Sequence, residues 1–484
     1  MPKKRKNIKT AIAIISLVLI SALILFNYNS KNEETICKDC NVILISIDTL
    51  RADHVGIYGY YRNTTPSIDN FASKSILFEN AIAQASWTLP SHTSIFTSLY
   101  PPSHGVLGIE DSLAKNITTI SKILKSNGYT TAAFIGGVQW FSPEYGLDKG
   151  FDTYDLINYS KTRLEGLKRS SIYFLDRTNP VYNWLSLNKN KKFFLFFHTY
   201  SVHDPYVTTN YYSRIFDTDY KGKMLDSEDE LLNVTWDVWE RNYSKKDLNK
   251  FLKEVVRPLL ESRTNYSDQK DVNHLIAVYD GKILRTDGFV GLLLNTISDY
   301  GLLNNTIIIV SSDHGEEFGE HGKFGHAQQL YEETIHVPLI IYNPEIQKGI
   351  RVKTQAQLID VVPTILDMLD IRVSKQFQGK SLLPTMLVQN SRDFNNYVFS
   401  FHGDMLSIRT NEWKLIFRVN GKHELYNLIS DPNEKNNLAE MNNYKLIELK
   451  RKLLDWSNSI GIKQGAKISS KDLEDKLRQL GYIT

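Results

Sequence analysis

The sequence of 484 residues predicts an α/β fold, in which a sheet is covered on both faces by helices and is followed by a smaller α+β subdomain. Short apolar, β-branched runs recur along the first 345 residues and alternate with amphipathic helical stretches. Beyond that point the pattern changes to an amphipathic helix, "QLIDVVPTILDMLDI", and a hairpin, "SIRTNEWKLIFRVNGKHELYNL", with its turn at Asn420 and Gly421. We therefore divide the chain into an N-terminal segment at 1–40, a main domain at 41–345 and a C-terminal subdomain at 346–484.

The N-terminal segment predicts a membrane anchor. The basic cluster "MPKKRKNIK" precedes an uncharged apolar run, "AIAIISLVLISALILF", whose length is at the lower edge of a bilayer span. A basic flank stays in the cytoplasm, so we expect a single-pass protein of the cell membrane with an extracytoplasmic main domain. A cleaved signal peptide is the alternative, although no small-residue cleavage site follows the run directly.

The composition is that of a globular protein, with 42% hydrophobic and 23% charged residues. The net charge is +3 and no stripe of basic and aromatic residues occurs, so nothing indicates nucleic-acid binding. The two cysteines, Cys37 and Cys40, form a CxxC pair before the first predicted strand. The pair could be redox-active or half of a zinc site, but no second CxxC exists. We favour a structural or incidental role, such as a small disulfide outside the cytoplasm.

Five apolar runs are predicted as strands: 41–48 "NVILISID", 130–137 "TTAAFIGG", 192–200 "KFFLFFHTY", 306–315 "TIIIVSSDHG" and 337–344 "VPLIIYNP". Predicted helices between them include "ITTISKILKSNGY", which ends near Gly128, and "DGFVGLLLNTISDYG" from Asp287. This alternation predicts parallel strands. Residues 158–280 are polar and tyrosine-rich, and we expect insertions and surface helices there.

Polar side chains follow three of these strands at their carboxyl ends. Ligands bind at this edge of open α/β sheets, and carboxylate and imidazole groups are ligands of divalent metals. Each group alone would be unremarkable, since "DHG" is also a common turn. Three strands that deliver such ligands to one edge are a stronger signal. The residues are Asp48, Thr49, His198, His203, Asp313 and His314.

Thr88 lies at the start of a predicted helix, in "WTLPSHTSIFTS". A threonine followed by a proline in the first turn predicts that Thr88 is the N-cap of a helix over residues 89–99. The N-terminus of a helix also favours an anion such as phosphate or sulfate. A hydroxyl held there beside a metal can be deprotonated and attack that anion. Cap and nucleophile are therefore compatible roles.

These motifs resemble those of a sulfatase of the alkaline phosphatase superfamily, in the same order and over about residues 41–460. The segments that carry the resemblance are "NVILISIDTLRADHVGIYGY", "WTLPSHTSIFTSLYPPSHGV", "FFLFFHTYSVHDPY", "IIIVSSDHGEEFGEHG", "LYEETIHVPLIIYNP", "IRTNEWKLIF" and "ELYNLISDPNEKNNLA". The resemblance implies a mixed sheet sandwiched by helices, with a catalytic domain at 41–345 and a small C-terminal α+β subdomain.

The resemblance also implies a divalent-metal site formed by Asp48, Thr88, Asp313 and His314. Thr88 matches the family's nucleophile, and His203 matches a histidine that could protonate a leaving oxygen. The set of carboxylates, imidazole and hydroxyl favours Zn or Mn, with Ca as a further possibility.

The chain departs from the family at residues that act on sulfate. Sulfatases have Cys or Ser, matured to formylglycine, in the motif C/S-x-P-S-R; here the motif runs from Thr88 to His92, and threonine cannot become that aldehyde. A second family carboxylate is replaced by Thr49, and "GGVQWF" lacks the expected lysine. His326 stands in place of another lysine; it could bind substrate, bind a second metal with His203, or pack.

We therefore expect a metal-dependent hydrolase that cleaves phosphate esters, or sulfate esters as the less favoured choice, with Thr88 as nucleophile. His203, His326 and His92 are the further catalytic candidates. The alternatives are a sulfuric ester hydrolase proper, a phospho-group transferase acting on a lipid or surface glycan, and an inactive glycan-binding module. The expected partners are a phospho- or sulfo-ester substrate and the membrane.

Overall fold

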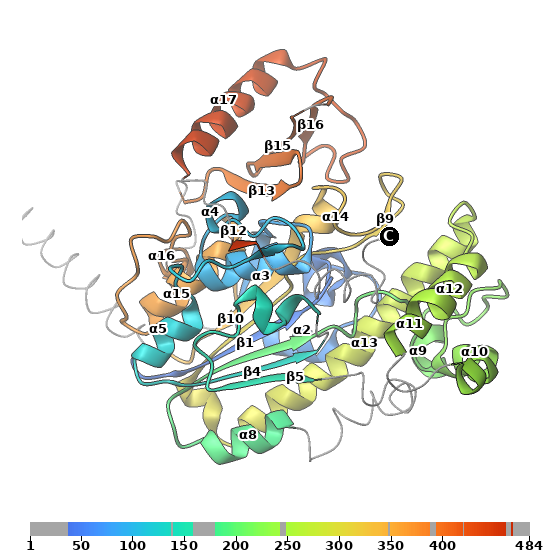
Figure 1. The fold of residues 1–484 in the computed structure, drawn as a ribbon. Helices are drawn as coiled ribbons and strands as arrows, with labels where there is room; N and C mark the ends of the chain where they lie inside the picture. The colour runs from blue at the N-terminus through green and yellow to red at the C-terminus, as the bar shows by residue number, and fades with distance from the viewer. Residues whose placement is uncertain are drawn as a thin grey trace, which may run out of the picture.

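The computed structural model describes residues 37–136, 139–157, 180–242, 248–346, 349–387, 394–419, 421–460 and 466–467 (Figure 1). The predicted anchor and its basic flank lie outside these residues. Within the described part of the chain, no helix has both the length and the apolar character that a bilayer crossing requires.

The core is a nine-stranded sheet in the order β11-β2-β10-β7-β1-β6-β4-β5, with β12 also paired to β2. Five neighbouring strands, from β7 to β5, are parallel. The strands are β1 (Asn41–Ile47), β2 (Ile76–Ile82), β4 (Thr130–Gly136), β5 (Thr153–Ile157), β6 (Phe193–Thr199), β7 (Thr306–Ser311), β10 (His336–Tyr342), β11 (Ile350–Val352) and β12 (Ala356–Gln357). All five predicted strands are present, and the mixed sheet implied by the family resemblance is confirmed.

The prediction of a parallel strand is wrong for "VPLIIYNP". This segment is β10, which runs antiparallel to both β7 and β2. The reason is the connection from β7, whose only helix is the four-residue α14 (Glu332–Ile335). A parallel return needs a longer crossover, so the chain instead turns at the carboxyl edge of β7 and comes back beside it.

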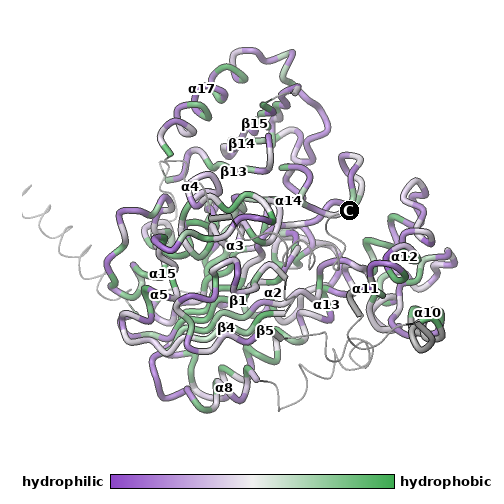
Figure 2. Tube along the Cα trace, in the orientation of Figure 1, coloured by the Kyte–Doolittle hydropathy of each residue, from purple (hydrophilic) through white to green (hydrophobic). Residues whose placement is uncertain are grey.

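Helices cover both faces of the sheet, as predicted. The strands of the centre are mostly apolar (Figure 2), because successive side chains enter opposite cores. In β1, Val42 and Leu44 pack on one side, and Ile43 and Ile45 pack on the other. The first core includes side chains of α3 (Thr88–Thr97), α5 (Ile120–Ser126) and α15 (Val361–Met368). The second includes side chains of α2 (Pro66–Ala72), α8 (Pro180–Asn188) and α13 (Gln269–Asp299).

Thr88 is not the N-cap that the sequence predicts. Trp87 takes that place, with an extended backbone at φ −159° and ψ 161°, and its carbonyl accepts a hydrogen bond from Ser91 N at 3.3 Å. Thr88 is therefore the first residue of α3 and belongs to its first turn. The helix ends at Thr97, and Ser98 takes a left-handed conformation with φ 55°.

Further helices follow β6 in the described part of residues 158–280, where surface helices were expected. They are α9 (Asn210–Arg214), α10 (Glu228–Asn242), α11 (Leu248–Phe251), a π-helical turn (Leu252–Val256) and α12 (Arg257–Arg263), grouped at one side of the molecule (Figure 1).

The C-terminal α+β subdomain is confirmed. A four-stranded antiparallel sheet packs against α17 (Asn443–Ser459) at the top of Figure 1. Its strands are β13 (Val398–His402), β14 (Met405–Arg409), β15 (Trp413–Arg418) and β16 (Glu424–Asn427). The predicted hairpin corresponds to β15 and β16, and Asn420 of its turn lies outside the described residues. The main sheet extends past residue 345, because β11 and β12 pair with β2.

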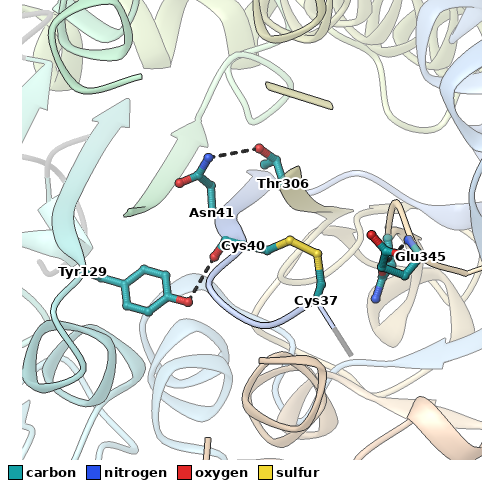
Figure 3. The surroundings of a disulfide bond; sticks show 7 residues. Cys37, Cys40, Asn41, Tyr129, Thr306 and Glu345 are labelled. Carbon is teal, nitrogen blue, oxygen red and sulfur yellow. Dashed lines mark hydrogen bonds between the residues drawn. A yellow bond between two sulfur atoms is a disulfide. The ribbon is translucent and has the colours of Figure 1, made fainter. Parts of the chain in front are cut away.

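Cys37 and Cys40 form a disulfide just before β1 (Figure 3). Both residues are buried, and the backbone around them is held by neighbouring groups. Cys37 N donates to the carbonyl of Met368 at 2.8 Å, and the hydroxyl of Tyr129 donates to the carbonyl of Cys40 at 3.0 Å. The disulfide thus fixes the chain where it enters the central sheet, which is a structural role.

Phe194→Ala tests the packing of the central sheet. Phe194 is fully buried in β6 and stacks on Phe151, with ring centroids 5.8 Å apart. Loss of the ring leaves a cavity that the paired strands cannot close, so we expect the free energy of unfolding to fall by about 3–5 kcal/mol. Denaturant unfolding measures the change, with Leu187→Ala as the control, since Leu187 is 71% exposed. Equal losses in both variants would contradict this account of the core.

Candidate active site

Two strand ends and the start of α3 bring four predicted side chains together. Asp48 follows β1, Asp313 and His314 follow β7, and Thr88 begins α3. Ligand atoms of Asp48, Asp313 and His314 lie within 4.8 Å of one another, and all three residues are buried. The hydroxyl of Thr88 lies 3.4 Å from Asp48 Oδ2 and 3.3 Å from His314 Nε2. The structure therefore assembles the residues that the sequence selects for a metal and a nucleophile.

The local backbone explains this convergence. β1 and β7 are parallel neighbours with Ser46 opposite Ser311, so the two aspartates follow at the same edge. Ser312 Oγ accepts a hydrogen bond from Leu50 N at 2.9 Å and donates to the carbonyl of His314 at 2.7 Å, which ties the two loops together. The start of α3 is fixed to the same place, because Ser91 Oγ donates to the carbonyl of Asp313 at 2.6 Å.

The carboxylates leave an unmet demand for positive charge. Asp48 Oδ1 and Asp313 Oδ2 are buried and have no hydrogen-bond partner among the described residues. Such oxygens are costly unless a donor or a cation satisfies them. His314 Nδ1 donates to the carbonyl of Gly315 at 2.9 Å, so the Nε2 lone pair faces the carboxylates. These residues fit a divalent cation.

The electrostatics favour the ionisation states that a cation needs. Burial alone would raise the pKa of Asp48, but the hydrogen bond from His198 and the charge of His203 hold that pKa below its usual range. Burial lowers the pKa of His314. A carboxylate and a neutral imidazole are the ligand forms of these groups.

His92 contacts the backbone carbonyl of Thr88 and not its hydroxyl group. Its Nε2 lies 2.9 Å from Ser46 Oγ, and its Nδ1 donates to the carbonyl of Thr88 at 3.0 Å. The same Nδ1 lies 3.3 Å from Asp313 Oδ2. Burial lowers the pKa of His92 to about 4, so the ring is neutral at physiological pH. This geometry suits a group that positions α3, and a direct catalytic role for His92 remains a prediction.

His203 and His326 form a second group beside the first. Their Nε2 atoms lie 3.2 Å apart, and the ring of His326 has its centroid 4.6 Å from that of His314. Burial opposes protonation of His326, but the charge and hydrogen bond of Glu316, 2.8 Å from Nδ1, raise its pKa to about 9. A protonated His326 thus places a positive charge next to the carboxylate site.

His198 was predicted only as one of the polar groups at the strand ends, and Glu316 and Lys282 carried no predicted role. His198 lies between the carbonyl of Gly136, at 2.7 Å, and Asp48 Oδ2, at 3.1 Å. In the sequence, His198 stands at the end of an apolar run and Glu316 stands beside "DHG". These positions were the signals that could have indicated a role for either residue. Lys282 of α13 is buried, and its side-chain nitrogen donates to the carbonyls of His203 and, at 2.8 Å, Pro205. Nothing local in the sequence connects Lys282 to this site.

Comparisons with known proteins agree with this architecture. A model of the sulfatase family matches residues 40–371, and a model of the C-terminal region of N-sulphoglucosamine sulphohydrolase matches residues 319–459. An arylsulfatase of Clostridium perfringens is 28% identical in an alignment of 478 positions. The alignment covers 86% of this chain and 93% of that protein.

Two solved structures share the fold at low sequence identity. The phosphonate monoester hydrolase of Agrobacterium radiobacter has a TM-score of 0.69 at 19% identity and covers 87% of this chain and 96% of its own. A protein solved in complex with its substrate D-glucosamine-2-N,6-O-disulfate has a TM-score of 0.67 at 22% identity, and covers 89% and 100% of the two chains.

Asp48→Asn tests the cation site. The amide is neutral and is a weaker ligand, so we expect this variant to hold one equivalent less metal per chain, with affinity at that site reduced by more than about 100-fold. Elemental analysis after equilibration with Zn²⁺ or Mn²⁺ measures the content. Asp299→Asn is the matched control, because Asp299 is exposed at the end of α13. Asp48→Asn with the metal content of the wild type would contradict the assignment.

Proposed function

Because the chain belongs to the sulfatase family, we propose that it is a metal-dependent hydrolase of phosphate esters with Thr88 as its nucleophile. The observation that carries this proposal is the position of the Thr88 hydroxyl, 3.3–3.4 Å from two members of a buried cluster of two aspartates and a histidine. A helix cap would not require such neighbours, whereas a nucleophile does.

The cation would be held by Asp48, Thr88, Asp313 and His314. This donor set favours Zn or Mn over Ca, since imidazole suits the transition metals. When bound, such an ion lowers the pKa of an adjacent hydroxyl and stabilises negative charge on the ester.

The chain's own residues then carry out a two-step transfer. The hydroxyl proton of Thr88 passes to Asp48 Oδ2, at 3.4 Å, as the Thr88 oxygen attacks phosphorus. A new bond forms between the Thr88 oxygen and phosphorus, and the bond from phosphorus to the leaving oxygen breaks. Water then attacks the phosphothreonine and gives a proton to His203, while the bond from phosphorus to the Thr88 oxygen breaks. Asp48 returns its proton to that oxygen, which releases phosphate and restores the hydroxyl. The N-terminus of the ten-residue α3 favours the anionic group throughout.

The two histidines beside the cluster complete the reaction. His326 is protonated at neutral pH, because its pKa is about 9, and supplies positive charge for a non-bridging oxygen. His203 Nε2 faces His326 at 3.2 Å and is held by a 2.6 Å hydrogen bond with the hydroxyl of Tyr200. We assign to His203 the delivery of a proton to the leaving oxygen.

The choice of phosphate over sulfate rests on Thr88. Threonine cannot be converted to the aldehyde of formylglycine, so the nucleophile is an unmodified hydroxyl. The shared fold with a phosphonate monoester hydrolase is compatible with a phosphorus centre. Sulfuric ester hydrolysis is the second candidate, and the observation in its favour is the match of residues 319–459 to a sulphohydrolase C-terminal region.

We place this site outside the cytoplasm, on a single-pass protein of the cell membrane. The disulfide between Cys37 and Cys40 supports the proposal, because such bonds persist in oxidising compartments. The apolar run at residues 11–26 would be the anchor. Protease added to intact cells is expected to digest the main domain, and full protection in intact cells with digestion after lysis would overturn the placement.

Thr88→Ala and Thr88→Ser test the nucleophile. We expect Thr88→Ala to lose at least about 1,000-fold in kcat, while Thr88→Ser keeps measurable turnover because it keeps a hydroxyl. Aryl phosphate, bis-aryl phosphate and aryl sulfate are compared as substrates. Unchanged activity in Thr88→Ala would remove the assignment, and turnover of aryl sulfate alone would favour the second candidate.

His203→Gln tests the proton donor. An acid is needed most when the leaving group is a poor one, so we expect turnover of an alkyl phosphate to fall about 100-fold or more and that of a nitrophenyl phosphate to fall much less. Steady-state kinetics on both substrates give the ratio. The same fractional loss on both substrates would show that His203 acts on something other than the leaving oxygen.

A further inference from the structure

A second group of ligand-type side chains lies outside the Asp48 cluster. One ligand atom each from Glu317, His321 and Glu333 lies within 4.8 Å of the others. Glu317 belongs to β8 (Glu317–Phe318), and Glu333 belongs to α14. Glu317 is fully buried, and the side chains of His321 and Glu333 are only 10% and 7% exposed. We propose that this group is a second divalent-cation site, which takes a transition metal ion such as Zn²⁺ or Mn²⁺.

His321 has the orientation of a metal ligand. Its Nε2 donates to the carbonyl of Glu434 at 3.0 Å, which turns Nδ1 toward Glu333 Oε1 at 2.5 Å. The ring is fixed by stacking on Tyr331, with centroids 3.6 Å apart and planes 10° from parallel. Histidines that bind metals usually donate their other N–H to a carbonyl or carboxylate in this way.

Glu317 supplies an unsatisfied oxygen to the group. Its Oε1 accepts a hydrogen bond from Gln329 at 3.1 Å, but the buried Oε2 has no hydrogen-bond partner among the described residues. A buried carboxylate with a free lone pair is costly, and a cation between it, Glu333 and His321 Nδ1 would remove that cost.

The charged residues around Glu317 also leave its carboxylate without a positively charged partner among the described residues. Glu316 is paired with His326 and Glu320 is paired with Arg51, whereas no described lysine or arginine lies within ion-pair distance of Glu317. Burial and the neighbouring Glu333 and Glu320 raise the pKa of Glu317 to about 8. A divalent ion bound by these three side chains would supply the missing positive charge.

The position of the group indicates a structural role. Glu317 follows the Asp313–His314 loop closely, and the carbonyl of Glu333 accepts a hydrogen bond from Glu316 N at 2.9 Å. His321 reaches the carbonyl of Glu434, which belongs to the C-terminal subdomain. A cation here would tie the active-site loop to that subdomain. The carboxylate and imidazole set favours Zn²⁺ or Mn²⁺ over Ca²⁺.

Metal counting on single and double variants of the full chain tests this inference. Protein stripped with a chelator is equilibrated with Zn²⁺, and bound metal is measured by elemental analysis. We expect two equivalents in the wild type, one in Glu317→Gln, one in Asp48→Asn and none in the double variant. His321→Gln is the second variant of the site. Glu440→Gln, at an exposed position, is the matched control and should keep both equivalents.

Thermal unfolding in the Asp48→Asn background provides a second readout. Zn²⁺ should raise the midpoint of Asp48→Asn, since one site remains, and should not raise that of Asp48→Asn/Glu317→Gln. Equal metal content and equal Zn²⁺ response in these two variants would overturn the inference and leave a proton-sharing carboxylate cluster. One equivalent that is lost in Glu317→Gln but kept in Asp48→Asn would support the second site and reject the proposed cation at Asp48.

Discussion

Two buried carboxylates, held at the ends of adjacent parallel strands, are the constraint around which this domain is organised. Asp48 and Asp313 follow β1 and β7, and each retains a buried oxygen without a hydrogen-bond partner among the described residues. Like charges at a buried sheet edge are unfavourable unless other groups offset them. The surroundings do this in part, because His198 contacts Asp48, His92 lies against Asp313, and the positive end of α3 points to the same place. A divalent cation would complete the balance, which links the stability of the site to its chemistry.

Thr88 determines what this site can do with that charge arrangement. It stands in the first turn of α3, where the sulfatase family forms an aldehyde that threonine cannot form. His326 is paired with Glu316, and its protonated ring puts a positive charge beside the cluster where the family uses a lysine. The fold of a sulfatase is thus kept, while Thr88 and His326 stand where the family has other residues. Direct transfer to an unmodified hydroxyl is the chemistry that we propose for these groups.

Much of the fold follows from local sequence pattern. The parts that could not be predicted are those set by pairing between distant segments of the chain. Buried strands such as β1 and β7 are continuous apolar runs, and Asp48, Asp313 and His314 come soon after their ends, so both the strands and the candidate ligands were predictable. The direction of β10 was not, because it depends on the short connection after β7. The start of α3 was misplaced by one residue, since the conformation of Trp87 decides it. Lys282 and the partners of Glu317 come from distant segments, and only the folded chain brings them to their neighbours.

The most direct test of the central claim is to trap the covalent intermediate on Thr88. Wild type is mixed with a rapidly reacting aryl phosphate, quenched in acid during turnover, and digested for peptide mass spectrometry. We predict that the peptide containing Thr88 gains the mass of one phosphoryl group, that fragmentation places the group on Thr88, and that Thr88→Ala shows no such species. Turnover with an unmodified Thr88 peptide at every quench time, or with the phosphoryl group on another residue, would contradict the account.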